Sequence, residues 1–231
     1  MQRFLVKSTL DGSEVKLPAL AARQVATVLR MRPGERLVVF DGSGPEWLGE
    51  LTEVGQVATV RLLERREPPN ASRRTVTLCQ AVLKGEKMEW VLQKGTELGV
   101  AVFQPILTER VVAHKTQVSE RWRRIVIEAT EQSGRTVLPA LRAPVTLAAA
   151  LGAGGAQVLC SETERSATLW SYLADGAPDV LSLFVGPEGG FSEAEVLRAR
   201  DRGAEAVSLG PLRLRAETAS VAAASLALLA P

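Results

Sequence analysis

The stretch Leu181–Val221, LSLFVGPEGGFSEAEVLRARDRGAEAVSLGPLRLRAETASV, decides the fold of this chain. It holds two loops, Gly186–Gly190 and Gly210–Arg215, and an apolar run typical of a buried strand precedes each of them. Between the loops, Ser192 and Glu195 have the spacing of a capping box, which predicts a short helix. This alternation of strand, loop and helix places ligand-binding loops side by side at the carboxyl ends of parallel strands.

The first loop is rich in glycine. Gly186, Gly189 and Gly190 fall within five residues, and a glycine backbone can adopt positive φ and approach a ligand without an intervening Cβ. Pro187 fixes the turn before anything binds. Such a loop can bind a ligand through backbone hydrogen bonds, although on its own it is equally typical of a tight strand-to-helix turn. The second loop, one helix away, favours ligand binding because it brings charged side chains: Arg213, Arg215 and Glu217.

The composition is that of a globular protein. The chain has 231 residues, 46% of them apolar and 23% charged, which suffices for one large domain or two smaller ones. A net charge of +2 indicates no partner by itself, since nucleic acid is bound by local clusters of Lys and Arg. Cys79 and Cys160 lie in apolar runs, so we expect reduced thiols in a cytoplasmic protein. A single histidine, no CxxC motif and no long apolar run predict neither a metal site nor a membrane span.

Residues 1–68 have the pattern of a small, mostly antiparallel β-barrel domain. Short apolar runs between turn residues predict strands at Arg3–Val6, Arg36–Phe40, Trp47–Leu51 and Val57–Leu63. One helical pattern, Pro18–Leu29, interrupts them. The boundary lies in the charged stretch Glu64–Arg74, whose paired prolines can continue neither a helix nor a central strand.

Residues 69–231 alternate between strand and helix patterns, which predicts an α/β domain with a parallel sheet covered on both faces. Strands are expected at Val76–Val82, Val102–Leu107, Val158–Cys160, Val180–Val185 and Ala206–Leu209. Beside the capping-box helix, helices are expected at Lys87–Leu98, at Ser119–Ser133 with Ser119 as the cap, and at Thr218–Ala230.

The paired motifs GPEGGFSEAE and LGPLRLRAETA resemble the signature of the RsmE family of SPOUT-class RNA methyltransferases. The similarity extends upstream to KGEKMEWVLQKGTELGV and EATEQSGR, so it covers Val76 to the C-terminus. The chain departs from the family at Leu212 and Leu214, which surround Arg213 where the family has a run nearer to Arg-Ile/Val-Leu-Arg. Arg215 keeps its place ahead of Ala-Glu-Thr-Ala.

This resemblance implies a SPOUT (trefoil-knot) α/β methyltransferase domain at residues 69–231, preceded by a PUA-like RNA-binding domain at residues 1–68. It implies S-adenosyl-L-methionine as the methyl donor and N3 of a uridine in 16S rRNA of the small ribosomal subunit as the acceptor. It also implies a homodimer. The residues expected to bind the cofactor are Gly186, Pro187, Glu188, Gly189, Gly190, Leu209, Gly210, Pro211, Leu212, Arg213 and Leu214.

Methylation at N3 requires that the N3 proton leaves and that negative charge on the uracil is stabilised. Arg135 and Arg215 are the guanidinium candidates for this charge, and each can equally bind a phosphate or pair with a carboxylate. Among the carboxylates near the expected pocket, Glu188 and Glu217, we place Glu217 with the catalytic residues, with capping of the last helix as its alternative role. His114 lies in a polar stretch and is expected at the surface.

Basic residues near the start of the second domain are the candidates for RNA binding. Lys84 and Lys87 follow its first strand, where basic side chains can follow an RNA backbone, and Arg73 and Arg74 lie in the boundary segment. As ordinary surface lysines, Lys84 and Lys87 would need no further explanation.

Other functional classes fit less well. A Rossmann fingerprint would have to use Leu151–Ala156, which lacks the third glycine and follows an alanine-rich helix instead of a strand. A P-loop is absent, because no Gly-Lys-Ser/Thr triplet follows a glycine loop. A non-catalytic RNA-binding dimer with a vestigial cofactor pocket remains the alternative, and a measurement of S-adenosylmethionine binding distinguishes it from the enzyme.

Overall fold

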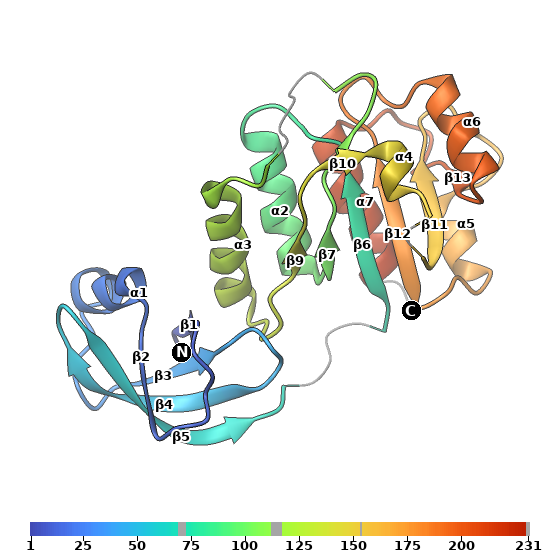
Figure 1. Ribbon diagram of the computed structural model, residues 1–231. Coiled ribbons are helices and arrows are strands. Elements are labelled where there is room, and N and C mark those ends of the chain that lie inside the picture. Colours follow the sequence, from blue (N-terminus) through green and yellow to red (C-terminus); the bar gives the residue numbers. More distant parts are fainter. Residues whose placement is uncertain (69–72, 112–116, 153, 230–231) are drawn as a thin grey trace. The chain divides into compact units, whose positions relative to one another are not determined.

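The computed structural model describes residues 1–68, 73–111, 117–152 and 154–229. The chain divides into two compact units (Figure 1), which are Met1–Asn70 with Thr130–Leu138, and Ala71–Ala129 with Pro139–Pro231. The domain boundary between residues 68 and 69 stays a prediction, because residues 69–72 lie outside the described part of the chain. His114 also lies outside it.

The first unit is built on a five-stranded sheet in the order β1-β3-β4-β5-β2. Its strands are β1 Arg3–Leu5, β2 Glu14–Lys16, β3 Arg36–Phe40, β4 Glu46–Val54 and β5 Ala58–Arg66. β1 pairs with β3 in parallel and the other neighbours pair antiparallel, so the predicted antiparallel character is largely present. The sequence pattern does not predict β2, because a three-residue strand with one buried side chain shows too little alternation. β1 and β2 are the edges, so the sheet stays open among the described residues.

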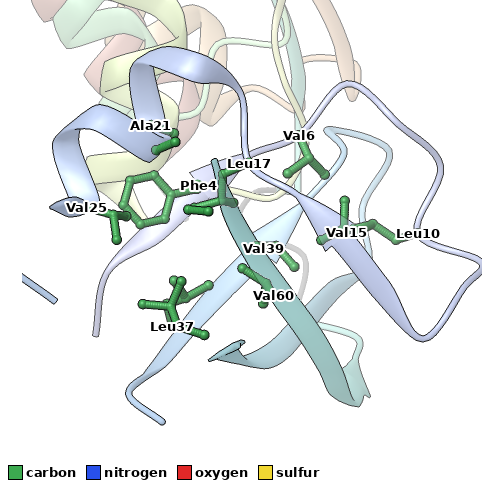
Figure 2. Packing of buried hydrophobic residues seen from close by; sticks show 13 residues of the cluster. Phe4, Val6, Leu10, Val15, Leu17, Ala21, Val25, Leu37, Val39 and Val60 are labelled. Carbon is green, nitrogen blue, oxygen red and sulfur yellow. The ribbon is translucent and has the colours of Figure 1, made fainter. Parts of the chain in front are cut away.

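The core of this unit lies between the sheet and one helical segment. That segment consists of α1 Ala19–Arg23 and the π-helical turn η1 Gln24–Val28, where the sequence predicts a single helix. Figure 2 shows Phe4 of β1 beside Val25 of η1, with Leu37 and Val39 of β3 in the same interior. All four side chains are almost completely buried. Burial of such a side chain stabilises a fold by about 1.5–3 kcal/mol.

Residues 130–138 also belong to the first unit. They include the end of helix α3 Glu120–Ser133, whose Glu131 Oε1 accepts a hydrogen bond of 2.8 Å from the backbone N–H of Leu5. Leu138 N donates to the carbonyl oxygen of Gly42 at 3.1 Å. Gly42 has a φ of +88°, and a Cβ there would lie 3.1 Å from the Cβ of Leu138. The close approach at this point therefore requires glycine.

The second unit is the predicted α/β domain. Its sheet has the order β13-β11-β12-β6-β7-β9, and every neighbouring pair is parallel. The strands are β6 Thr75–Gln80, β7 Val102–Phe103, β9 Ala140–Leu141, β11 Ala156–Cys160, β12 Val180–Val185 and β13 Glu205–Val207. A separate pair consists of β8 Ile106–Leu107 and β10 Val145–Thr146. The remaining helices are α2 Glu86–Leu98, α4 Leu147–Ala150, α5 Leu169–Ala174, α6 Glu193–Asp201 and α7 Ala216–Leu229.

The predicted strand Val102–Leu107 is in fact two strands, β7 and β8, which pair with different partners. Pro105 lies between them, and a proline has no backbone N–H with which to continue a central ladder. The predicted helix boundaries agree better with the structure. Gly99 ends α2 in the left-handed region with a φ of +108°, and Ser119 Oγ accepts a hydrogen bond from Trp122 N at the start of α3.

Helix α7 packs against α2 and against strands β6 and β12. Ala223, Ala224 and Ala227 are fully buried, and their small side chains permit this close packing. Arg74 is only 8% exposed, and its Nη1 donates a hydrogen bond of 3.3 Å to the carbonyl oxygen of Ala227. A cation near the last turn of a helix is stabilised by the helix dipole. Across the described ranges, none of the helices combines the length and the hydropathy required to cross a bilayer.

Candidate active site

Three loops meet at the carboxyl ends of three neighbouring strands of the second unit. β11 lies between β13 and β12 in the sheet, so the loops that follow these strands come together around one cavity of about 520 Å³. All of the residues predicted to bind the cofactor line this cavity except Gly189. Arg215 and Lys87 line it as well. The volume is in the range of small-molecule sites.

The first loop depends on its glycines. Gly190 N donates a hydrogen bond of 2.9 Å to the carbonyl oxygen of Pro187, which closes a turn, and Gly190 has a φ of +67°. A Cβ on Gly186 would lie 3.2 Å from the carbonyl carbon of Gly190 and from the backbone nitrogen of Phe191. Side chains at either position would therefore displace the backbone that lines the cavity.

Gln80 connects this loop to the last helix. It is fully buried at the end of β6, and its Nε2 lies 3.4 Å from the carbonyl oxygen of Gly186 and 2.9 Å from that of Ala81. Its Oε1 is within hydrogen-bond reach of the Ser220 hydroxyl on α7. Sequence reasoning missed this residue, and the available signal was a polar side chain inside the apolar run VTLCQAVL. The contacts fix the loop before any ligand binds.

The second loop presents apolar and charged side chains to the cavity. Ser208 Oγ accepts a hydrogen bond of 3.1 Å from Gly210 N, which holds the loop where it leaves β13. Leu212 is 79% exposed although it lines the cavity, and Leu214 is half-buried. Arg213 Nε lies 3.0 Å from Glu162 Oε2.

The third loop, which follows β11, was not predicted. Ser161, Glu162, Thr163 and Arg165 line the cavity from this side, next to Cys160 at the end of the strand. Ser161 and Thr163 share a hydrogen bond of 2.9 Å between their hydroxyls. The sequence signal was weak, because a polar run after a strand is typical of any surface turn.

Two carboxylates and one ammonium group lie together at the edge of the cavity: Lys87 and Glu188 line it, and Glu217 lies behind them without lining it. Lys87 Nζ lies 2.9 Å from Glu188 Oε1 and 4.0 Å from Glu217 Oε2. Burial raises the pKa of Glu188, but the hydrogen bond from Lys87 and nearby backbone donors outweigh it, so the pKa is lowered overall. The Glu217 side chain is 15% exposed, and its buried Oε2 has no hydrogen-bond partner among the described residues.

The other predicted residues are scattered. Lys84 is exposed, and Arg73 is exposed with its Nε 3.5 Å from Asp179. Arg74 is buried against α7, so its side chain is not exposed to a phosphate. Arg135 belongs to the first unit and is not among the residues that line the cavity; burial lowers the pKa of its guanidinium.

The thiols and the acidic residues provide little further chemistry. Burial raises the pKa of Cys160, and likewise that of Cys79, to about 12, so both are poor nucleophiles at neutral pH. Within the described ranges, no three His, Cys, Asp or Glu side chains gather as metal ligands would.

A nucleotide-sized cavity between glycine-bearing loops at the carboxyl ends of parallel strands indicates an α/β enzyme domain that binds a nucleoside-type ligand. Sequence comparison defines the class more closely. The family described as RNA methyltransferase domain matches residues 70–228, and the family described as RNA methyltransferase PUA domain matches residues 25–56. The chain is thus an RNA methyltransferase with a PUA domain.

Within this class the chain belongs to the ribosomal RNA small subunit methyltransferase E family. The family's member from a Synechocystis species is 37% identical to it, over 90% of this chain and 71% of that protein. The member from Rickettsia conorii is 32% identical over 96% of this chain and 92% of its own length.

Solved structures of similar proteins agree with this family assignment. The family's member from Neisseria gonorrhoeae, bound to S-adenosyl methionine, has a TM-score of 0.88 and 34% identity over 97% of this chain and 95% of its own. A putative methyltransferase from Legionella pneumophila, in complex with the same cofactor, has a TM-score of 0.85 and 32% identity over 98% and 95% of the two chains. The predicted fold class, a SPOUT α/β methyltransferase domain preceded by a PUA-like domain, is confirmed.

Proposed function

We propose that this protein transfers the methyl group of S-adenosyl-L-methionine to N3 of a uridine in 16S rRNA. The observation that carries the proposal is the single cavity enclosed by the loops after β11, β12 and β13, in a chain whose relatives methylate small-subunit ribosomal RNA by name. Two structural relatives hold S-adenosyl methionine.

The residues around the cavity can bind and position S-adenosyl-L-methionine. Backbone groups of the Gly186–Gly190 turn and of the second loop would hold the adenine by hydrogen bonds, and the side chains of Leu209, Leu212 and Leu214, which line the cavity, would provide apolar contact. The loops are held in place by Gln80 and by the Pro187 turn, so little reorganisation accompanies binding. Most of the rate enhancement then comes from holding the sulfonium and the acceptor nitrogen in line.

The reaction also requires removal of a proton, because the neutral imide of uracil is a poor nucleophile. Glu217 takes the proton from N3, and the electron pair left on N3 attacks the methyl carbon. The bond between that carbon and sulfur breaks, and its electron pair returns to sulfur to give neutral S-adenosylhomocysteine. Arg215 at the cavity provides the guanidinium group proposed to stabilise the charge on the uracil, and the same role for Arg135, in the first unit, stays a prediction.

RNA binding is assigned to basic side chains that the structure leaves accessible. Lys84 and Arg73 are exposed, and Lys87 is half-exposed, so each can approach a phosphate. The PUA-like unit provides a second RNA surface. We place the enzyme in the cytoplasm, with the small ribosomal subunit as its partner.

A homodimer is part of the proposal. The buried alanines of α7 pack within the chain, and the same helix presents Val221, Ala222 and Leu226 half-buried and Leu229 exposed at 66%. These apolar side chains are available to a second copy. Light scattering at micromolar concentration tests this, and a monomer would contradict it.

Two measurements test the function itself. Isothermal calorimetry with S-adenosylmethionine is expected to show binding at one site per chain, and its absence would favour an RNA-binding protein without catalysis. Incubation with the cofactor and 16S rRNA or small subunits, followed by mass spectrometry of the nucleosides, is expected to yield N3-methyluridine. A methyl group on another base or on ribose would overturn the assignment of N3.

A further inference from the structure

The ammonium group of Lys87 is placed differently from that of a lysine that only contacts an RNA backbone. Lys87 lies in the first turn of α2 and lines the cavity, while Glu188 of the first loop and Glu217 of α7 approach it from two other elements. Lys84, three residues before Lys87 in the sequence, is exposed and forms no ion pair in the described structure. Three elements thus hold the Lys87 charge at the cavity wall.

The partner carboxylate of Glu217 has an unused acceptor. Its Oε2 is buried without a hydrogen-bond partner among the described residues, and Glu217 lies in the first turn of α7, where the helix dipole favours a negative charge. Buried polar atoms are almost always satisfied, so this oxygen is an exception, and its residue directly follows Ala216, which lines the cavity. Among the described residues, Lys87 is the one cation within ion-pair distance of this oxygen.

The other ionisable groups around Glu217 leave this pairing undisturbed. Of the elements that pack against α7, β12 carries no ionisable side chain, β6 carries only the Cys79 thiol and α5 only the Tyr172 phenol. On α2, the neighbouring charges pair elsewhere: Lys94 with Glu97, and Glu89 with Arg121. Glu86 is exposed, and so is Arg215 on the loop before α7.

Resting on the proposed N3-methylation, we propose that Lys87 is a catalytic residue whose ammonium becomes the counter-ion of the uracil anion as the N3 proton passes to Glu217. The N3–H bond breaks, the proton goes to the Glu217 carboxylate, and the electron pair stays on N3, shared with the two carbonyl oxygens of the base. Lys87 keeps its own proton. The positive charge that balanced Glu217 now balances the uracil until N3 takes the methyl group, and Glu217 then releases the proton to solvent.

The geometry makes this exchange of partners efficient. The hydrogen bond to Glu188 holds Lys87 in place while its second partner changes, so the cation need not reorganise during the reaction. Because Glu188 belongs to the cofactor loop, the same contact places the cation beside the methyl donor.

Steady-state methylation of 16S rRNA by Lys87→Met and by the native enzyme, followed across pH, tests the proposal. We expect kcat to fall about 100-fold, the loss typical of a removed charge stabiliser, and the activity to recover partly as pH rises, because hydroxide then helps to deprotonate N3. Lys94→Met, on the same helix with an ion pair of its own, is the matched control and should behave as the native enzyme. Lys84→Met should instead raise KM and reduce the dependence on salt.

Lys87→Arg keeps the positive charge, so it tests the role of that charge even if Lys87→Met folds poorly. It should retain at least about a tenth of the native kcat and the native pH profile. The proposal is overturned if Lys87→Arg is as defective as Lys87→Met, if Lys87→Met only raises KM, or if calorimetry shows that Lys87→Met has lost the cofactor itself. Failure of the proposed function would be distinct, because the native enzyme would then form no N3-methyluridine.

Discussion

Arg213 and Glu162 join two loops of the cavity that are separated by 51 positions in sequence, with Arg213 Nε 3.0 Å from Glu162 Oε2. Glu162 follows β11 and Arg213 follows β13. The arginine side chain is 80% exposed, so water screens the pair and it contributes at most about 1 kcal/mol to the free energy of unfolding. Its effect is to hold the rim of the cavity in one arrangement.

Replacement Arg213→Ala is therefore expected to weaken cofactor binding without destabilising the protein. A loss of about 1 kcal/mol of binding free energy corresponds to a roughly fivefold higher Kd for S-adenosylmethionine. Calorimetry measures this, with thermal unfolding as the check on stability. Arg124→Ala, at an exposed position of α3, serves as the control. A native Kd in Arg213→Ala would show that the ion pair does not shape the site.

Substitution Gly186→Ala should damage the cavity more severely. The new Cβ would lie 3.2 Å from backbone atoms of Gly190 and Phe191, which can yield only if the turn moves. We expect cofactor affinity to fall at least about tenfold and stability to fall by about 1–3 kcal/mol. Gly55→Ala, where a Cβ meets nothing within 4 Å, is the matched control for calorimetry and urea unfolding. An unchanged Kd would mean that the cofactor does not depend on this turn.

Gln80→Leu tests the buried connection between the first loop and α7. The substitution removes the amide that faces the Gly186 carbonyl and leaves the Ser220 hydroxyl without that partner. Unsatisfied buried groups cost about 1–3 kcal/mol, so the free energy of unfolding in urea should fall by that amount. Gln93→Leu, exposed on α2, should change it little. Equal effects of the two substitutions would contradict a specific role for Gln80.

Glu164, in the loop that follows β11, makes stability depend on acid pH. The hydroxyl and backbone N–H of Ser166, with the Arg165 N–H and Arg200, lower the pKa of Glu164 from 4.5 to about 2. Because the folded pKa is below the unfolded one, this contribution is complete above pH 4.5 and disappears as pH falls towards 2. Urea unfolding of the native protein and of Glu164→Gln should therefore differ at pH 7 and converge near pH 2. A difference independent of pH would refute the assignment.

The two glycine loops could be predicted from sequence because their information is local. Glycine content, the proline and the preceding apolar runs all lie within a few residues, and the capping box of Ser192 and Glu195 is present with both hydrogen bonds. The short apolar runs before the loops are enough to predict the two strands. These features predict two loops at the carboxyl ends of parallel strands, and the structure has a cavity between the loops at that place.

The third loop and the central link could not be predicted, because they depend on strand order. Glu162 reaches the cavity only because β11 lies between β12 and β13, and Gln80 because β6 pairs with β12. No short stretch of sequence predicts that β11 lies between β12 and β13 or that β6 pairs with β12. Arg74 is a charged residue in the boundary segment, so its sequence context predicts exposure. It is buried because the C-terminal end of α7, distant in sequence, covers it.

The placement of residues 130–138 has a consequence for synthesis. When only the first 68 residues have left the ribosome, the N–H of Leu5 still lacks Glu131 as an acceptor, and Gly42 still lacks its contact with Leu138. The PUA-like unit is thus completed only after more than half of the chain has been translated. N-terminal fragments that stop at the linker should consequently be more sensitive to proteases than the same residues in the whole protein.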